Sequence, residues 1–69
     1  MSTLITDFRR LIVGQQYNVV SNAGYFAHKC TFDGFAGEFA RFVDSLGRVH
    51  HVHQSDCYRD DNPVHVYAY

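Results

Sequence analysis

The chain has 69 residues, of which 46% are hydrophobic and 16% aromatic, so it is expected to fold as one small domain. Six basic residues against seven acidic residues give a formal net charge of -1, whereas a nucleic-acid-binding domain of this size usually carries a basic excess. So short a chain has little room for both a hydrophobic core and a substrate cleft, which argues against an enzyme.

The sequence contains no signal for export or for a membrane. No apolar run approaches the roughly 20 residues that span a bilayer. The N-terminal stretch MSTLITDFRRLIVGQ has its charges in the middle and lacks the apolar centre of a signal peptide. These patterns predict a cytoplasmic protein with no membrane partner, in which cysteines are reduced.

Residues 1–13 form a segment of their own ahead of a domain that covers residues 14–69. The apolar positions of this segment recur at helical spacing: Leu4, Phe8, Leu11 and Ile12. This spacing predicts a short N-terminal helix that ends at Gly14. The β-branched residues Ile12 and Val13 favour the alternative, an extended lead-in.

Residues 14–69 are rich in alternating apolar and polar positions, which is typical of strands. The strands are expected at 15–20, 25–33, 38–44, 48–53 and 64–69, with a helical turn at 54–58. Asp44-Ser45-Leu46-Gly47 predicts a tight hairpin with a left-handed glycine. The three-residue spacing of Val49 and Val52 predicts a bulge near His50. Because short strands with exposed edges aggregate, five antiparallel strands are expected to close into a barrel.

Three features carry a resemblance to a known fold. They are the GQQYNVV entry to the first strand, the RFVDSLGRVHHV hairpin, and the QSD turn ahead of the last strand. With these features, residues 14–69 resemble a Src-homology-3-like small β-barrel of the Tudor or KOW type. The resemblance implies a mainly-β, five-stranded antiparallel barrel that acts as a binding module, and it leaves the ligand open.

The stretch RVHHVHQSDC holds three of the five histidines and one of the two cysteines. A tetrahedral zinc site is one reading of it, and its ligands would be His28, Cys30, His53 and Cys57. No CxxC motif supports that reading, so the sequence predicts a protein without a cofactor and keeps zinc as an alternative. A disulfide between the two cysteines is a further alternative, which a reducing compartment disfavours.

A catalytic reading of the same stretch is weaker. Cys57 would be the nucleophile, a neighbouring histidine the base and Asp56 the group that orients it. Nothing in the sequence marks an oxyanion hole, so no catalytic residue is assigned. The expectation is a non-enzymatic protein.

The aromatic residues suggest a core and a contact surface. Four phenylalanines within the expected strands are assigned to the core: Phe26, Phe32, Phe39 and Phe42. In a Tudor-like barrel, Tyr25, Phe26 and Tyr58 would be candidates for an aromatic cage that grips a methylated side chain. The alternating strand PVHVYAY offers an edge for a partner strand or for a homodimer. A docked N-terminal helix would offer a second surface for a protein partner or a homodimer.

The sequence therefore predicts a small interaction module whose main partner is another protein. Its size is typical of phage- and plasmid-type accessory proteins that bind and modulate a larger protein. The predicted contact residues are Tyr25, Phe35, Arg41, Arg48, His51, His53, Tyr58 and Tyr67.

A nucleic-acid-binding barrel is the alternative function, and a zinc-stabilised adaptor is the second alternative. The first requires the basic residues to gather on one face, with tyrosines stacking on bases. Those residues are Arg9, Arg10, Lys29, Arg41, Arg48 and Arg59.

Overall fold

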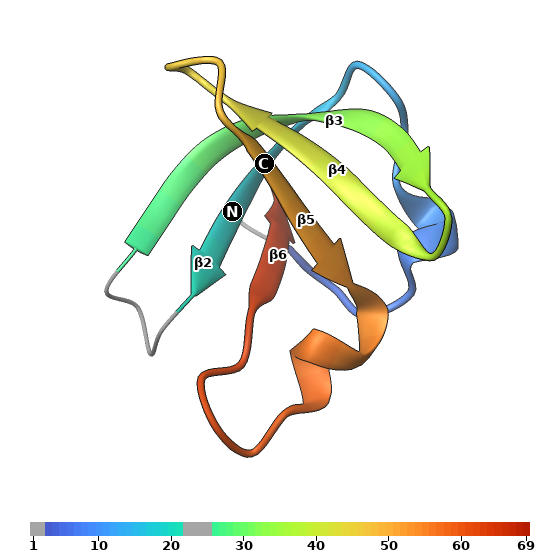
Figure 1. Ribbon diagram of the computed structural model, residues 1–69, viewed down its shortest axis with the longest axis vertical. Coiled ribbons are helices and arrows are strands. Elements are labelled where there is room, and N and C mark those ends of the chain that lie inside the picture. Colours follow the sequence, from blue (N-terminus) through green and yellow to red (C-terminus); the bar gives the residue numbers. More distant parts are fainter. Residues whose placement is uncertain (1–2, 22–25) are drawn as a thin grey trace.

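The structure is a computed structural model that describes residues 3–21 and 26–69, with the backbone alone for residues 26–28. The described part forms a mainly-β domain with one sheet and two short 3-10 helical turns, and it contains no α-helix. The elements, in chain order, are β1 (Thr3–Ile5), η1 (Phe8–Arg10), β2 (Gln16–Ser21), β3 (Phe26–Ala36), β4 (Phe39–Asp44), β5 (Val49–His53), η3 (Gln54–Tyr58) and β6 (His65–Ala68) (Figure 1).

The sheet has six strands in the order β1-β6-β2-β3-β4-β5, and every pair is antiparallel. Strands β1 and β5 are its two edges and do not pair with each other. The antiparallel sheet was predicted, but the closed five-stranded barrel is wrong. After β5 the chain turns away through η3, as Figure 1 shows, and β6 pairs instead between β1 and β2. None of the strands in residues 3–21 and 26–69 pairs with the far side of β5.

The N-terminal segment takes the extended form, and the predicted helix is wrong. Thr3 lies opposite Ala68 in the ladder between β1 and β6. Asp7 then caps η1 by accepting a hydrogen bond from the Arg9 amide at 3.0 Å. Ile12 is 60% exposed, although helical spacing had assigned it to the buried face. A helix this short is marginal alone, whereas the extended form gains main-chain bonds with β6.

Strand β3 is longer than predicted and contains the irregularity of the sheet. It continues through Gly34, whose φ is 101°, to Ala36 before the turn at Gly37. Its register with β4 shifts between Phe32 and Phe35. Strand β5 pairs with β4 without interruption, so the bulge predicted near His50 is wrong. Regular alternation already explains why Val49 and Val52 lie on opposite faces.

The hairpin between β4 and β5 has the predicted geometry. Gly47 takes a left-handed conformation with φ of 81°, and its amide donates to the carbonyl of Asp44 at 3.0 Å. A residue other than glycine is strained at this φ, which explains the glycine at the end of the turn.

The core lies on the inner face of the curved sheet. Phe42 is fully buried, with its ring centroid 5.5 Å from that of Phe32 and 6.2 Å from that of Tyr17. Phe39 is 46% exposed, so its assignment to the core is wrong: Ala40 and Phe42 occupy the inner positions of β4, and Phe39 alternates outward. The buried apolar residues are Phe8, Leu11, Tyr17, Val19, Cys30, Phe32, Ala40, Phe42, Val52 and Val66.

Two hydrogen bonds from η3 connect the ends of the sheet. The side-chain oxygen of Gln54 accepts from the Phe8 amide at 2.9 Å. The hydroxyl of Tyr58 donates to the carbonyl of Thr6 at 3.3 Å. The turn that follows β5 therefore holds the segment that follows β1. Neither helical turn among the described residues has the length or the apolar composition needed to cross a membrane.

Candidate binding grooves at the two sheet edges

The predicted contact residues do not form one patch. Arg41 and His51 lie opposite each other on the outer face of β4 and β5. Tyr67 is on β6, Tyr58 ends η3 with 64% exposure, and Phe35 lies near the end of β3 with 51% exposure. Tyr25, which was also predicted, lies outside the described residues, as does the side chain of Phe26, so the cage is left untested.

The three clustered histidines have different surroundings. His51 points outward and is exposed, whereas His50 points inward, and its Nε2 lies 2.8 Å from the carboxylate of Asp44. His53 lies where β5 meets η3. Its Nδ1 accepts from the Ser55 amide at 3.1 Å, and its own amide donates to Asp56 at 3.0 Å. The side chains of His50 and His51 therefore lie on opposite faces of β5, and His53 caps the 3-10 turn that follows the strand.

Asp44 organises the hairpin from inside, and its side chain is only 4% exposed. Its carboxylate accepts hydrogen bonds from the amides of Leu46 and Arg48, each at 2.9 Å, and from the Arg48 Nε at 3.1 Å. The hydrogen bond from His50 is the main reason why the pKa of Asp44 lies well below its ordinary value. The backbone amides add to that effect, and burial opposes it. The ionised carboxylate thus fixes both the turn and the start of β5.

Cys30 and Cys57 form no disulfide with each other. Cys30 is buried in the core, and burial raises the pKa of its thiol to about 11. Burial also raises the pKa of Cys57, which lies in η3. A protonated thiol is a poor nucleophile and a poor metal ligand.

The proposed zinc ligands are spread over β3, β5 and η3. Cys30 is on the inner face of β3, while His53 lies at the far end of β5 beside Glu38, with 3.5 Å between the two side chains. The side chain of His28 lies outside the described residues. In the described part of the chain, no group of three or more His, Cys, Asp or Glu side chains is arranged to hold a metal ion.

Most of the basic side chains are paired with aspartates and do not gather into a stripe. The nearest nitrogen-to-oxygen distances are 2.8 Å for Arg9–Asp7, 3.5 Å for Arg41–Asp33, 3.1 Å for Arg48–Asp44 and 3.8 Å for Arg59–Asp56. The ammonium group of Lys29 lies over the ring of Tyr69, 5.6 Å from its centroid. Among the described residues, the guanidinium of Arg10 has neither a hydrogen bond nor a salt bridge.

A groove of about 340 Å³ follows the edge of β5. One wall is the strand itself from Val49 to Val52, and the other is formed by Val19 and Ser21 of β2 together with Val64. The groove therefore combines four valines with three polar residues, which are His50, His51 and Ser21. It occupies the side on which the sheet fails to close.

The main chain of β5 offers hydrogen bonds into this open side. The Asp44 amide donates to the Arg48 carbonyl at 2.9 Å, so these two residues form a hydrogen-bonded pair. Antiparallel alternation then directs the amides and carbonyls of Val49, His51 and His53 away from β4. The His53 amide is already bound to Asp56, which leaves Val49 and His51 to pair with another strand.

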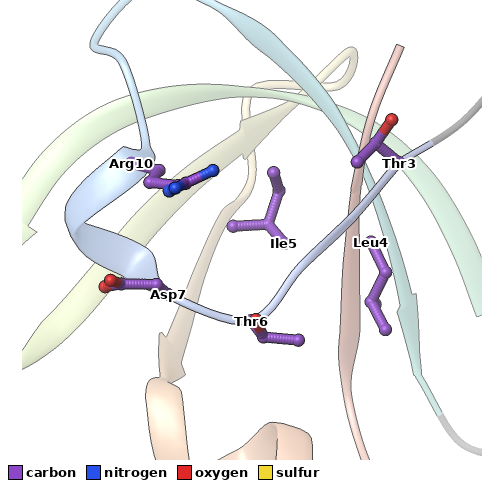
Figure 2. Close-up of a pocket in the computed structure, with 6 residues that line it drawn as sticks. All are labelled: Thr3, Leu4, Ile5, Thr6, Asp7 and Arg10. Carbon is purple, nitrogen blue, oxygen red and sulfur yellow. The ribbon is translucent and has the colours of Figure 1, made fainter.

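A second groove, also of about 340 Å³, lies along β1 at the opposite edge. Its lining residues are Thr3, Leu4, Ile5, Thr6, Asp7 and Arg10. Figure 2 shows the guanidinium of Arg10 extending across the hollow toward Ile5, while the carboxylate of Asp7 points away from it. Strand β1 pairs on one side only, because β6 is its single neighbour.

The last strand is not an edge, contrary to the prediction for PVHVYAY. Strand β6 pairs with β1 on one side and with β2 on the other. Its main chain is therefore occupied on both sides, so it offers no free edge to a partner strand. The N-terminal segment, which was not predicted as an edge, forms one through β1.

The sequence predictions missed the apolar walls of the β5 groove and the burial of Asp44. A signal for the second was present: Ala40, Phe42 and Asp44 share the inner face of β4 by alternation. The groove walls had no such signal, because β2 and β5 meet only through the curvature of the sheet. Comparisons with protein-family models, curated proteins and solved structures gave no match.

Proposed function

We propose that the protein is a small non-catalytic interaction module that binds an extended segment of a larger protein along the edge of β5. The observation that carries this proposal is that the main-chain amides and carbonyls of Val49 and His51 point away from β4 and lie beside an open groove. An added strand would gain main-chain hydrogen bonds from β5 and would place alternate side chains in the groove.

The charges around β5 favour an uncharged partner strand. Arg48 is paired with Asp44 and Arg41 with Asp33, while Glu38 lies beside His53. Four valines line the groove together with Ser21 and two histidines, and none of these residues is acidic or an arginine or lysine. The segment that fits this site alternates apolar residues with uncharged polar residues, and salt is expected to have little effect on its affinity.

The strand order and the η3 turn ahead of β6 support the resemblance to a Src-homology-3-like topology, here with an open side. The pairing of four arginines with aspartates disfavours the nucleic-acid alternative, since a phosphate backbone requires free cations. The raised thiol pKa values support a non-catalytic role.

The test uses a blocked peptide of about seven residues that alternates valine with glutamine, a usual strand length. Titration of the isotopically labelled protein should shift the amide resonances of Val49 and His51 most strongly. His51→Pro removes an outward amide without removing a bond to β4, and an edge strand tolerates proline. We expect binding to be lost.

His51→Thr is the matched control, because it removes the imidazole and keeps the amide. We expect this variant to bind as well as the wild type. Equal binding by His51→Pro and His51→Thr would overturn the proposal, as would amide shifts in the wild type that avoid β5. The wild-type shift map decides the question even if the proline variant does not fold.

A further inference from the structure

Beyond the β5 site, we infer that the edge of β1 is a second docking surface, specific for an extended segment that carries carboxylates on one face. This inference concerns the opposite edge of the sheet and does not depend on the proposed function. It rests on the juxtaposition of a free strand edge, a groove and an unpaired guanidinium.

Two charged residues line this groove, Arg10 and Asp7. The neighbouring Arg9 is neutralised by Asp7, with 2.8 Å between its Nη2 and the carboxylate. The hydrogen bond from the Arg9 side chain is the main reason why the pKa of Asp7 falls to about 2. Asp7 therefore stays ionised and engaged mainly with Arg9. Arg10 also attracts this carboxylate, but more weakly than Arg9 does, and it makes no salt bridge of its own among the described residues.

The alternation of β1 defines the faces of the bound segment. Thr3 and Ile5 share one face of the strand, and Figure 2 shows the guanidinium of Arg10 on their side. Leu4 is on the other face and is 44% exposed. A strand that adds to β1 would thus place acidic side chains toward Arg10 and apolar side chains beside Leu4.

The two grooves differ in the chemistry of the segment that they select. The β5 groove is lined by valines, histidines and a serine, and the nearby Arg48 is paired with Asp44. The β1 groove contains Arg10, which makes no salt bridge among the described residues, two threonines, and Asp7, whose carboxylate is engaged by Arg9. The chemistry of the β1 groove fits the acidic and apolar alternation of a partner strand. A basic segment is repelled by Arg10.

The experiment titrates the labelled protein with three blocked peptides of about seven residues. They alternate valine with glutamate, with glutamine or with lysine. We expect the glutamate peptide to shift the amides of Leu4 and Ile5 at the lowest concentration, and added salt to weaken this binding. Equal binding of the glutamate and lysine peptides at β1 would overturn the inference.

Two matched variants locate the charge. Arg10→Gln should lower the affinity for the glutamate peptide by about three- to fivefold, the range expected for an exposed ion pair. Arg41→Gln removes the same charge from β4, where Arg41 is paired with Asp33 and lies outside the groove, so its effect should be smaller. Equal losses in the two variants would mean that net charge alone acts, which overturns the docking surface.

The readout separates this inference from the proposed function, because the amides of β1 and β5 are observed independently. Shifts at Val49 and His51 without shifts at Leu4 and Ile5 overturn the β1 surface alone. Shifts at Leu4 and Ile5 that follow protein concentration instead of peptide would identify a second copy as the occupant. That result would also overturn the inference.

Discussion

The two edges of the sheet are fixed in different ways. Strand β5 follows β4 through a tight hairpin, and the buried carboxylate of Asp44 bonds to Leu46, Arg48 and His50 within six residues of itself. Strand β1 depends on distant parts of the chain: it pairs with β6, and Gln54 holds the amide of Phe8. Local contacts form with little loss of chain entropy, whereas long-range contacts must first close a large loop.

This difference predicts different dynamics at the two docking surfaces. The β1 edge is three residues long and is held by a few exposed bonds, so it should open locally before the rest of the sheet. The β5 edge should stay ordered until global unfolding. The predictions below test this contrast, from the largest expected effect to the smallest.

The largest loss of stability is expected from a substitution in the core, because both edges of the sheet pack on it. Phe42→Ala removes a fully buried ring that packs on Phe32 and Tyr17. The expected loss is about 3–5 kcal/mol in the free energy of unfolding, which approaches the whole stability of so small a domain. Chemical denaturation measures it, with Leu46→Ala at the exposed hairpin tip as the control. A loss below about 1 kcal/mol would contradict the assigned core.

The next effect should fall on the β5 side and should depend on pH. Asp44 has a folded-state pKa below its ordinary value of 3.8, so its stabilising contribution is present above that value and is lost as the pH falls below it. Asp44→Asn should be less stable at pH 7, and its stability should fall less than that of the wild type between about pH 5 and pH 2.

The control for this variant is Asp33→Asn, which removes a half-exposed carboxylate that lies 3.5 Å from Arg41. Its pH profile of stability should follow that of the wild type. If the free energy of unfolding fell equally with decreasing pH in Asp44→Asn and in the wild type, the buried carboxylate would not be what stabilises the hairpin.

A smaller effect is expected at the β1 edge. Gln54→Ala leaves the half-buried Phe8 amide without its acceptor and should cost about 1 kcal/mol. Hydrogen exchange should speed up at Phe8 and in β1 while β5 keeps its protection. Gln15→Ala, at an exposed position, is the control. Uniformly faster exchange across the sheet would show that the two edges open together.

The smallest effect is expected from Tyr58→Phe. The hydroxyl of Tyr58 donates to the Thr6 carbonyl at 3.3 Å in an exposed position. Its loss should change the free energy of unfolding by less than about 0.5 kcal/mol. Denaturation curves measured alongside Gln54→Ala rank the two bonds. A larger loss of stability in Tyr58→Phe than in Gln54→Ala would show that the Tyr58 bond, and not the Gln54 bond, contributes more to the β1 edge.

The sequence by itself determined those parts of the fold that depend on neighbours along the chain. Alternation placed all five predicted strands to within about three residues at each end, and it assigned His51 and His53 to one face and His50 to the other. The turn from Asp44 to Gly47 was predicted because its residue types favour one backbone geometry. These features need no knowledge of the tertiary structure.

The tertiary structure alone decided the state of residues 3–11 and the openness of the sheet. The apolar spacing of Leu4, Phe8 and Leu11 suits a helix, but pairing with β6 makes β1 extended. The curvature of the sheet brings β2 and Val64 beside β5, where they form one groove, and the path of residues 3–10 forms the other groove beside Arg10. Such outcomes depend on contacts between distant segments, and local periodicity carries no information about which strand becomes the neighbour of another.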